Sequence, residues 1–545
     1  MKDTQDSKNA ENEARERTTN AVEENVETSD KGEKKGTRRR NAIFGAAILA
    51  VVTLGVGSWA SGTPNLPKNF EDAGKLPVIY PDYVGTTLPP NVAPLNFRVE
   101  EEGERYLTSV YSKNGAEIVV EGQNAQFPLK KWRALLEANI GETLVFDVYV
   151  QKDGKWLRYQ SVENAIAPDR VDPYLAYRLI EPGYEFGHRI SLRQRNVETF
   201  EENDFFNNRA HATSPCVNCH SFQNRETDRF LFHYRRLNEP GKGGTIVVED
   251  GKARKVSAKL DDAEISCSYP AWRPTGDLVA FSANQTRQIF HLTSTQKIEV
   301  FDLMSDLTIY DAKKNELRRL TATNDVFETF PSWSPDGSAL YYCAANVAPK
   351  TAESDVKGRE NELPKRIDEF RYNVMRMSFD EKTGTFGAPE TVVDAAARGR
   401  SSLHPRVSPD GKFLVWTEAA SGTFPIWRPE ADLYIKNLAT GEERAWTEAN
   451  GENSDSYHSW SSNGRWMAFS SRREDGLYTR VYFTYVDADG RATKPFVLPQ
   501  KDPTRNRRHF KSYNVPELIT EPIEIDIKTL TDAAVTETIP TKNVK

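Results

Sequence analysis

The sequence is poor in sulfur, in long apolar runs and in excess positive charge. Four Cys among 545 residues are too few for a disulfide scaffold, which needs several times that density. Lys+Arg number 72 against 79 Asp+Glu, a net charge of −7 that disfavours nucleic-acid binding. No G-x-S-x-G occurs, so the serine-hydrolase chemistry of propeller peptidases is also disfavoured. What is present, 10% aromatics with 32 Gly and 30 Pro, is typical of a turn-rich, mainly β globular protein.

The N-terminus predicts a membrane anchor. Residues 1–40 contain no aromatic residue and are rich in Glu, Lys, Asn and Thr, which predicts a disordered cytoplasmic tail. Residues 41–60 carry no charge and are long enough to cross a bilayer as a helix. The basic KKGTRRR segment before them orients the tail inward and the rest outward. The prediction is a single-pass protein of the inner (cytoplasmic) membrane with its main body in the periplasm. A signal peptide cleaved after Ser58-Trp59-Ala60 is the alternative.

The exported part divides into four further segments. Residues 61–85 hold four prolines and predict an extended linker. Residues 86–200 contain short alternating runs separated by NG, DG and GE pairs, interrupted by PLKKWRALLEA, and predict a small β-rich domain of sandwich type. Residues 201–515 repeat a motif that is described next, and residues 516–545 are predicted to be a C-terminal tail.

Four segments of the body share a pattern of strand, tight turn and strand. Their turns are centred on Thr275-Gly276, Asp336-Gly337, Asp410-Gly411 and Asn463-Gly464, dipeptides that supply the positive φ of a hairpin turn. Further strand-like runs follow each pair, and four strands per unit make a propeller blade. Extra residues fall between the second and third strands and build up one face. These insertions are residues 285–305, 347–370 and 421–430.

The strings WSPDG, RVSPDG and WRPTG resemble the Pro-Asp repeats of TolB-like propellers, which are similar to WD40-like propellers. This resemblance covers roughly residues 215–500 and implies about six blades and a protein-interaction platform. A fifth repeat begins at CVNCH. The sixth blade would combine residues 174–180 and 190–194 with a closing strand near residues 513–519.

Residues 216–220 read CVNCH, the pattern of covalent haem attachment. Cys216 and Cys219 would form thioethers with the haem vinyl groups, and His220 would be the proximal iron ligand. A thioredoxin-like redox pair and a zinc half-site are the alternatives, but the surrounding sequence predicts loop followed by strand, and no second ligand pair has matching spacing. The pentapeptide resembles c-type cytochromes, although no cytochrome helical domain surrounds it.

The repeat predicts where this haem c would lie. His220 aligns with His458 at a blade entry, and blade entries converge on the central channel, so haem is expected at the channel mouth on the face with the insertions. The second iron ligand is predicted from His291, His404 and His458. His188, His211 and His509 remain conceivable, and an open sixth position is the other alternative. Cys267 and Cys343 are expected as a disulfide or as two buried free thiols.

These features favour a membrane-anchored mono-haem protein that transfers single electrons or senses redox state while docking a redox partner or an envelope protein complex. It is then more an electron carrier or binding protein than a classical enzyme. A TolB-like interaction scaffold without enzymatic activity is the first alternative. A haem enzyme with an open iron site, peroxidase-like or reductase, is the second.

Overall fold

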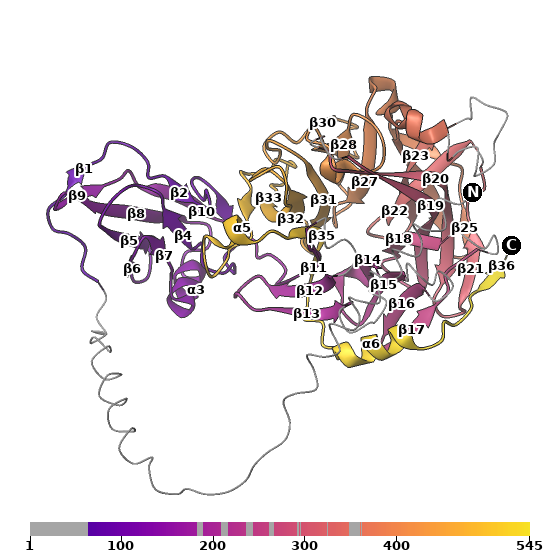
Figure 1. Cartoon of the computed structure of the whole chain (residues 1–545), viewed down its shortest axis with the longest axis horizontal. Coiled ribbons are helices and arrows are strands. Elements are labelled where there is room, and N and C mark those ends of the chain that lie inside the picture. Colours follow the sequence, from indigo (N-terminus) through magenta and orange to yellow (C-terminus); the bar gives the residue numbers. More distant parts are fainter. Residues whose placement is uncertain are drawn as a thin grey trace, which may run out of the picture. The chain divides into compact units, whose positions relative to one another are not determined.

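The computed structural model describes residues 64–182, 189–208, 216–235, 243–260, 266–291, 294, 296–323, 325–347, 360 and 362–544 (Figure 1). The predicted tail, the predicted membrane span at residues 41–60, and His188 and His211 lie outside these residues. No helix among the described residues is long and apolar enough to cross a membrane.

The first described segment forms a small, mainly β domain with one helix, in agreement with the predicted β-rich domain. A seven-stranded sheet has the order β1-β9-β8-β10-β3, with β5 paired to both β8 and β6, and a second sheet has the order β2-β4-β7. Trp132 is fully buried on the one long helix of this domain and stacks on Phe127. The elements are β1 Glu71–Asp72, β2 Ile79–Tyr80, β3 Thr87–Leu88, β4 Phe97–Val99, β5 Arg105–Tyr111, β6 Ile118–Glu121, β7 Asn124–Ala125, α3 Leu129–Glu137, β8 Thr143–Lys152, β9 Lys155–Arg158 and β10 Val162–Ile166.

Six sheets follow, which we name blades A to F, and all their strand pairs are antiparallel except that of β21 with β36. Blade A is β11 Tyr174–Ile180, β12 Ile190–Asn196, β13 Glu202–Asn207 and β35 Ser512–Ile519; blade B is β14 Cys216–Phe222, β15 Arg229–Arg235, β16 Gly244–Glu249 and β17 Lys252–Val256; blade C is β18 Ser266–Trp272, β19 Leu278–Phe290, β20 Ile298–Asp311, β21 Glu316–Arg319 and β36 Lys542–Val544. Blade D is β22 Val326–Trp333, β23 Ala339–Asn346, β24 Asn373–Asp380, β25 Thr385–Phe386 and β26 Glu390–Val393; blade E is β27 Ser401–Val407, β28 Phe413–Ala419, β29 Asp432–Asn437 and β30 Glu443–Ala445; blade F is β31 Asp455–Trp460, β32 Trp466–Ser471, β33 Arg480–Tyr485 and β34 Phe496–Val497. Short helices connect strands, either within a blade or from one blade to the next: η2 Gln223–Arg225, η4 Leu363–Lys365, η5 Ile367–Glu369, η6 Ala396–Arg398, η7 Pro425–Trp427 and α5 Arg505–Arg508.

The innermost strands of the six blades form a closed ring. Contacts run from β14 to β18, β22, β27, β31 and β35, and β35 returns to β14. Blade A joins chain segments far apart in sequence, because β11 pairs with β12 on one side and with β35 on the other. The chain is therefore a six-bladed β-propeller in which a strand from near the C-terminus completes the sheet that begins at Tyr174.

The Ser-Pro-Asp-Gly turns between the first two strands of a blade are held by side-chain hydrogen bonds. In blade D, Ser334 Oγ donates to Asp336 Oδ1 at 2.6 Å and accepts from the Ala339 N–H at 2.9 Å. Ser408 and Asp410 repeat this arrangement in blade E. The serine and the aspartate close the turn while glycine supplies the positive φ, 68° at Gly337.

The small domain is packed against the propeller through blade F. The Ser462 N–H donates to Asp172 Oδ2 at 2.7 Å, and Trp466 Nε1 donates to the Asp169 carbonyl at 2.9 Å. One hydrophobic core includes Phe146 of the small domain and Phe483 of blade F.

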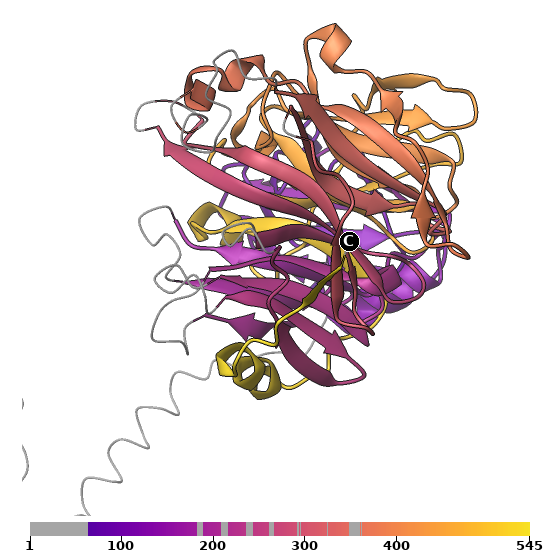
Figure 2. The same cartoon turned by 90° about the vertical axis from the view of Figure 1, so that its right-hand side faces the viewer.

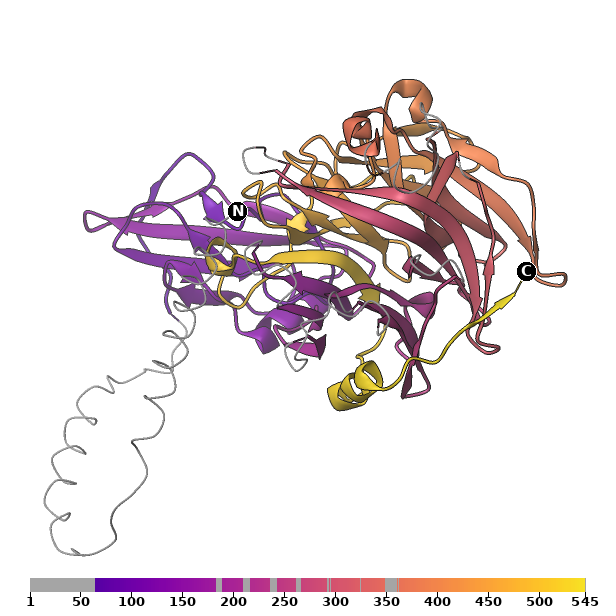
Figure 3. The same cartoon turned by 45° about the vertical axis from the view of Figure 1, so that its right-hand side comes forward.

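Residues 516–545 are predicted to be a C-terminal tail, but β35 extends to Ile519 and residues 520–544 cross three blades. Helix α6 (Ile527–Val535) buries Leu530, Ala533 and Ala534 and contacts β13, β16 and β17. Strand β36 then pairs in parallel with β21 and so becomes the outermost strand of blade C. Figures 2 and 3 show this segment running along the outside of the sheets to the C-terminus.

Candidate functional site

The same backbone irregularity occurs in the innermost strand of every blade. Each of these strands has a register shift against its neighbour, and within it one residue that is not glycine adopts a φ between 49° and 55°. Such bulges redirect side chains, and left-handed non-glycine residues are uncommon. They are Cys219 in β14, Tyr269 in β18, Phe330 in β22, His404 in β27, Tyr457 in β31 and Val515 in β35.

Four of these bulge residues form an aromatic arc in the channel. Ring centroids are 4.6 Å apart for Tyr269 and Phe330, 4.1 Å for Phe330 and His404, and 4.5 Å for His404 and Tyr457. Two cavities meet at this level, since both are lined by His220, His404 and Tyr457.

We name the two cavities by their distinctive residues. The thiol-side cavity, about 270 Å³, is lined by Cys216 and Cys219, and by residues of the insertions that the sequence analysis places on one face, such as Gln288 and Ile426. The arginine-side cavity, about 450 Å³, is lined by Arg225 and by residues that follow the bulges.

The CVNCH motif lies in β14, not in a loop before a strand as the sequence suggests. The bulge in this strand turns Cys219 and His220 into the channel. Cys216, which precedes the bulge, lines the same cavity. Arg178 of blade A lies beside Cys216, with Nη2 3.9 Å from Sγ and Nη1 donating to Asn218 Oδ1 at 2.8 Å. Both thiols and the adjacent imidazole thus line one cavity, as covalent haem attachment needs.

His220 is poised as a neutral imidazole. Its side chain is fully buried, and neither ring nitrogen has a hydrogen-bond partner among the described residues. Burial, with the charge of Arg178 as a smaller contribution, lowers the His220 pKa to about 4. Glu517 Oε2 is 3.8 Å from Nε2. Unpartnered buried nitrogens are costly unless a ligand uses them, and a neutral imidazole is the form that binds a metal.

Of the three histidines predicted as second ligands, one lines the thiol-side cavity. His404 is buried, neither ring nitrogen has a hydrogen-bond partner among the described residues, and burial holds its pKa well below its usual range. In the ring of six strands, β27 is three places from β14, so His404 and Cys219 lie across the channel from each other.

The other two predicted ligands do not line that cavity. His458 is buried, but its Nε2 lies 3.1 Å from the Val415 carbonyl, and this hydrogen bond turns the ring toward blade E. His291 is exposed beyond the end of β19. His458 does align with His220, since each follows the bulge residue of its strand. However, the hydrogen bond to blade E engages Nε2 of His458.

His233 is a further residue of the site that is absent from the predicted set. This residue of β15 is paired with Asn218 and lines the thiol-side cavity, and neither ring nitrogen has a hydrogen-bond partner among the described residues. Burial lowers its pKa to about 3. The signal available in the sequence was alternation: if Asn218 faces the cavity, so does its cross-strand partner. His509, also considered, lies in a separate pocket with Arg195 and Arg505.

The remaining two cysteines are buried free thiols in different blades. Cys267 Sγ lies 3.4 Å from Thr308 Oγ1, and Cys343 is fully buried in β23. Of the two options that the sequence leaves open, the structure has the free thiols. No group of three or more His, Cys, Asp or Glu side chains that could hold a metal ion occurs among the described residues.

The ring of six blades and its channel define the chain as a β-propeller protein. No protein-family model matches it. A curated relative, the uncharacterized protein Atu1656 of Agrobacterium fabrum, is 21% identical over 246 residues, which are 42% of this chain and 79% of the relative.

Solved structures with low sequence identity align with large parts of the chain. An oligogalacturonate lyase in complex with manganese is 13% identical, with a TM-score of 0.32 over 64% of this chain and 87% of its own. Kuenenia stuttgartiensis hydrazine synthase is 10% identical, with a TM-score of 0.37 over 62% and 48%. The β-propeller domain of the Trilobed protease from Pyrococcus furiosus is 11% identical, with a TM-score of 0.29 over 75% and 98%.

Proposed function

We propose that the chain is a mono-haem electron-transfer protein in which a propeller holds haem c. Cys216 and Cys219 would carry the thioethers and His220 would bind the iron. The observation that carries this proposal is that both thiols and the unpartnered imidazole nitrogens of one pentapeptide line a single cavity. The haem would supply a one-electron couple. The chain would supply a buried, low-dielectric site and a neutral axial imidazole.

His404 is the proposed second iron ligand. It lies across the channel from the motif, is held between Phe330 and Tyr457, and has no hydrogen-bond partner among the described residues for either nitrogen. Two imidazole ligands give low-spin iron, which suits electron transfer, whereas a vacant position suits an enzyme. The position of His404 across the channel from the motif therefore favours the electron-transfer function over the haem-enzyme alternative.

We further propose that the propeller is TolB-like in also serving as a docking surface, and that the protein is exported and anchored by residues 41–60. The charge-free run with a basic segment before it supports the anchor. Haem attachment to a CxxCH motif requires an exported location, so the two proposals depend on each other.

The test is expression of the full chain with an intact c-type haem maturation system. A denaturing gel stained for haem, together with the visible spectrum, is read for the wild type, for Cys216→Ala and Cys219→Ala together, and for the matched control Cys267→Ala and Cys343→Ala together. We expect haem in the wild type and the control and none in the first variant. Wild-type protein that folds but stains for no haem would leave the interaction scaffold as the function.

A further inference from the structure

The arginine-side cavity shares His220 and His404 with the thiol-side cavity, but its two arginines have no part in the haem proposal. It is about 450 Å³, within the range of pockets that bind small molecules. It lies on the other side of the bulge residues from the thiols. Ser221, Ser332 and Ser459 line it at equivalent positions two residues beyond the bulges of their strands, and Arg406 and Glu517 occupy the same position in β27 and β35.

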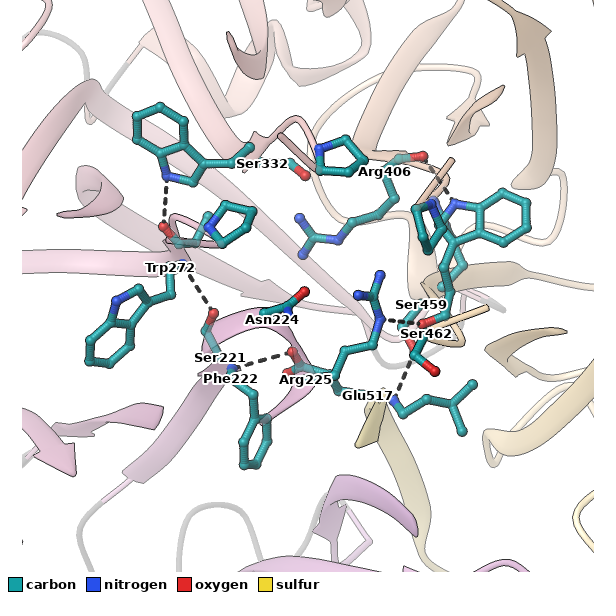
Figure 4. Close-up of a pocket in the computed structure, with 18 of the residues that line it drawn as sticks. Ser221, Phe222, Asn224, Arg225, Trp272, Ser332, Arg406, Ser459, Ser462 and Glu517 are labelled. Atoms are coloured by element: carbon teal, nitrogen blue, oxygen red, sulfur yellow. Dashed lines mark hydrogen bonds between the residues drawn. The ribbon is translucent and has the colours of Figure 1, made fainter. Parts of the chain in front are cut away.

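Two guanidinium groups are directed into this cavity. Figure 4 shows Arg225 and Arg406 extending toward its centre from different blades. The Arg406 side chain donates no hydrogen bond to any described residue, and Arg225 donates only from Nε, at 3.0 Å to the Trp460 carbonyl. An arginine carries five N–H donors, so most of the hydrogen-bonding capacity of both side chains is free.

The fold holds Arg225 in the cavity at a conformational cost. Asn224 and Arg225 have φ of 50° and 68°, two consecutive left-handed residues without glycine. The Thr520 N–H donates to the Arg225 carbonyl at 3.1 Å and fixes this turn. Strained backbone of this kind persists where the surrounding structure enforces it and is frequent at ligand sites.

The charges inside the cavity leave room for an anion. Besides the two arginines, the cavity is lined by the half-buried carboxylate of Glu517, which accepts a hydrogen bond from the Phe222 N–H at 3.3 Å, and by the exposed carboxylate of Glu226. The Glu517 carboxylate neutralises at most one of the two guanidinium charges.

We propose that the arginine-side cavity binds a small anion through a carboxylate or phosphate group held by Arg225 and Arg406. Paired guanidinium groups recognise such oxyanions by parallel charge-assisted hydrogen bonds. The serine hydroxyls supply further donors, and Trp272, Trp333 and Trp460 give the cavity aromatic walls. The proposal rests on residues of the chain and does not depend on haem.

The test is calorimetric titration of the full chain with succinate and, separately, with inorganic phosphate, at constant ionic strength kept with chloride. The variant lacking Cys216 and Cys219 is titrated in parallel, so that absence of haem and absence of anion binding are read independently. We expect one saturable site for at least one probe. We expect Arg225→Gln and Arg406→Gln each to weaken binding by about tenfold or more. Arg133→Gln, an exposed arginine of α3, is the matched control and should bind as the wild type.

Ser332→Asp is a second variant that does not remove an arginine. It places a carboxylate on the wall of the same cavity, so we expect it to compete with the anion and abolish binding, with far-UV circular dichroism confirming that the variant is folded. If neither probe binds at millimolar concentration, or if the arginine variants bind as tightly as the wild type, the proposal is wrong. Preference for succinate over phosphate, or the reverse, would identify the anionic group.

Discussion

Cys219 and His404 occupy the same bulge position in strands that lie across the channel from each other, with φ of 50° and 55°. The bulge turns both side chains toward the channel, where one belongs to the proposed haem-attachment motif and the other has free imidazole nitrogens. The bulge that is repeated in every blade thus directs these side chains into the channel, and the residue at each bulge determines the chemistry there.

The first prediction concerns the second iron ligand. In haem-loaded protein, His404→Ala should convert the visible spectrum from low-spin to high-spin and allow cyanide to bind, because the sixth position opens. His458→Ala is the matched control, since the hydrogen bond of His458 to the Val415 carbonyl keeps its ring occupied. Its spectrum should remain low-spin. Should His404→Ala leave the spectrum unchanged, His233→Ala is the next variant to measure, and His404 is not the ligand.

The second prediction concerns the strain of the bulges. Val515 is β-branched and has a φ of 50°, so Val515→Gly should be more stable than Val515→Ala by about 1 kcal/mol, because only glycine removes the steric conflict. At Val407, which is not among the positive-φ residues of the structure, the order should reverse by a similar amount. Both pairs are compared by denaturant unfolding. Equal stabilities of the two Val515 variants would mean that the bulge is not strained.

The third prediction concerns the C-terminal segment. Leu530→Ala in α6 should lower the free energy of unfolding by about 2–4 kcal/mol, because Leu530 is fully buried against the propeller. Val535→Ala, at an exposed position of the same helix, should change it by less than about 0.5 kcal/mol. Equal effects of the two substitutions in denaturant unfolding would contradict the packing of α6.

The fourth prediction concerns pH. Asp302 is buried, accepts a hydrogen bond from Asn284 Nδ2 at 3.2 Å, and burial raises its pKa from 3.8 to about 7. The folded protein therefore holds this proton more tightly than the unfolded chain does. Its contribution is fully favourable below pH about 4 and is lost as the pH rises to about 7, by up to about 1.4 kcal/mol per pH unit.

Asp302→Asn mimics the protonated carboxyl and isolates this contribution. The melting temperature of the variant relative to the wild type should rise between pH about 4 and pH about 7 and level off above. Asp394→Asn, an exposed carboxyl that accepts a hydrogen bond from Asn373, serves as the control and should show a much smaller change. A difference between Asp302→Asn and the wild type that is independent of pH would show that Asp302 is ionised in the folded protein.

Much of the fold follows from local sequence signals. The turn motif Ser-Pro-Asp-Gly specifies its own hydrogen bonds at Ser334 and Asp336, so each repeat identifies a hairpin without tertiary information. The pairing of β11 with β35, which the sequence analysis proposes from blade count, is present. The role of residues 520–544 was not predictable, because α6 and β36 owe their order to contacts with the outer strands of other blades.

The site was predictable in its chemistry but only partly in its composition. Cys216, Cys219 and His220 form a local motif, and the repeat alignment places them in the channel. His233 faces the cavity only because it is the cross-strand partner of Asn218, and Arg406 only because it follows a bulge. Bulge positions are set by the packing of six strands around the channel, and the sequence pattern of one strand does not mark them.

The most direct test of covalent haem in the channel is the intact mass of the full chain, purified after expression with haem maturation and alkylated after denaturation. The account predicts the mass of the polypeptide plus one haem, with alkylation at Cys267 and Cys343 and none at Cys216 or Cys219. A polypeptide mass without haem and with all four cysteines alkylated would contradict it.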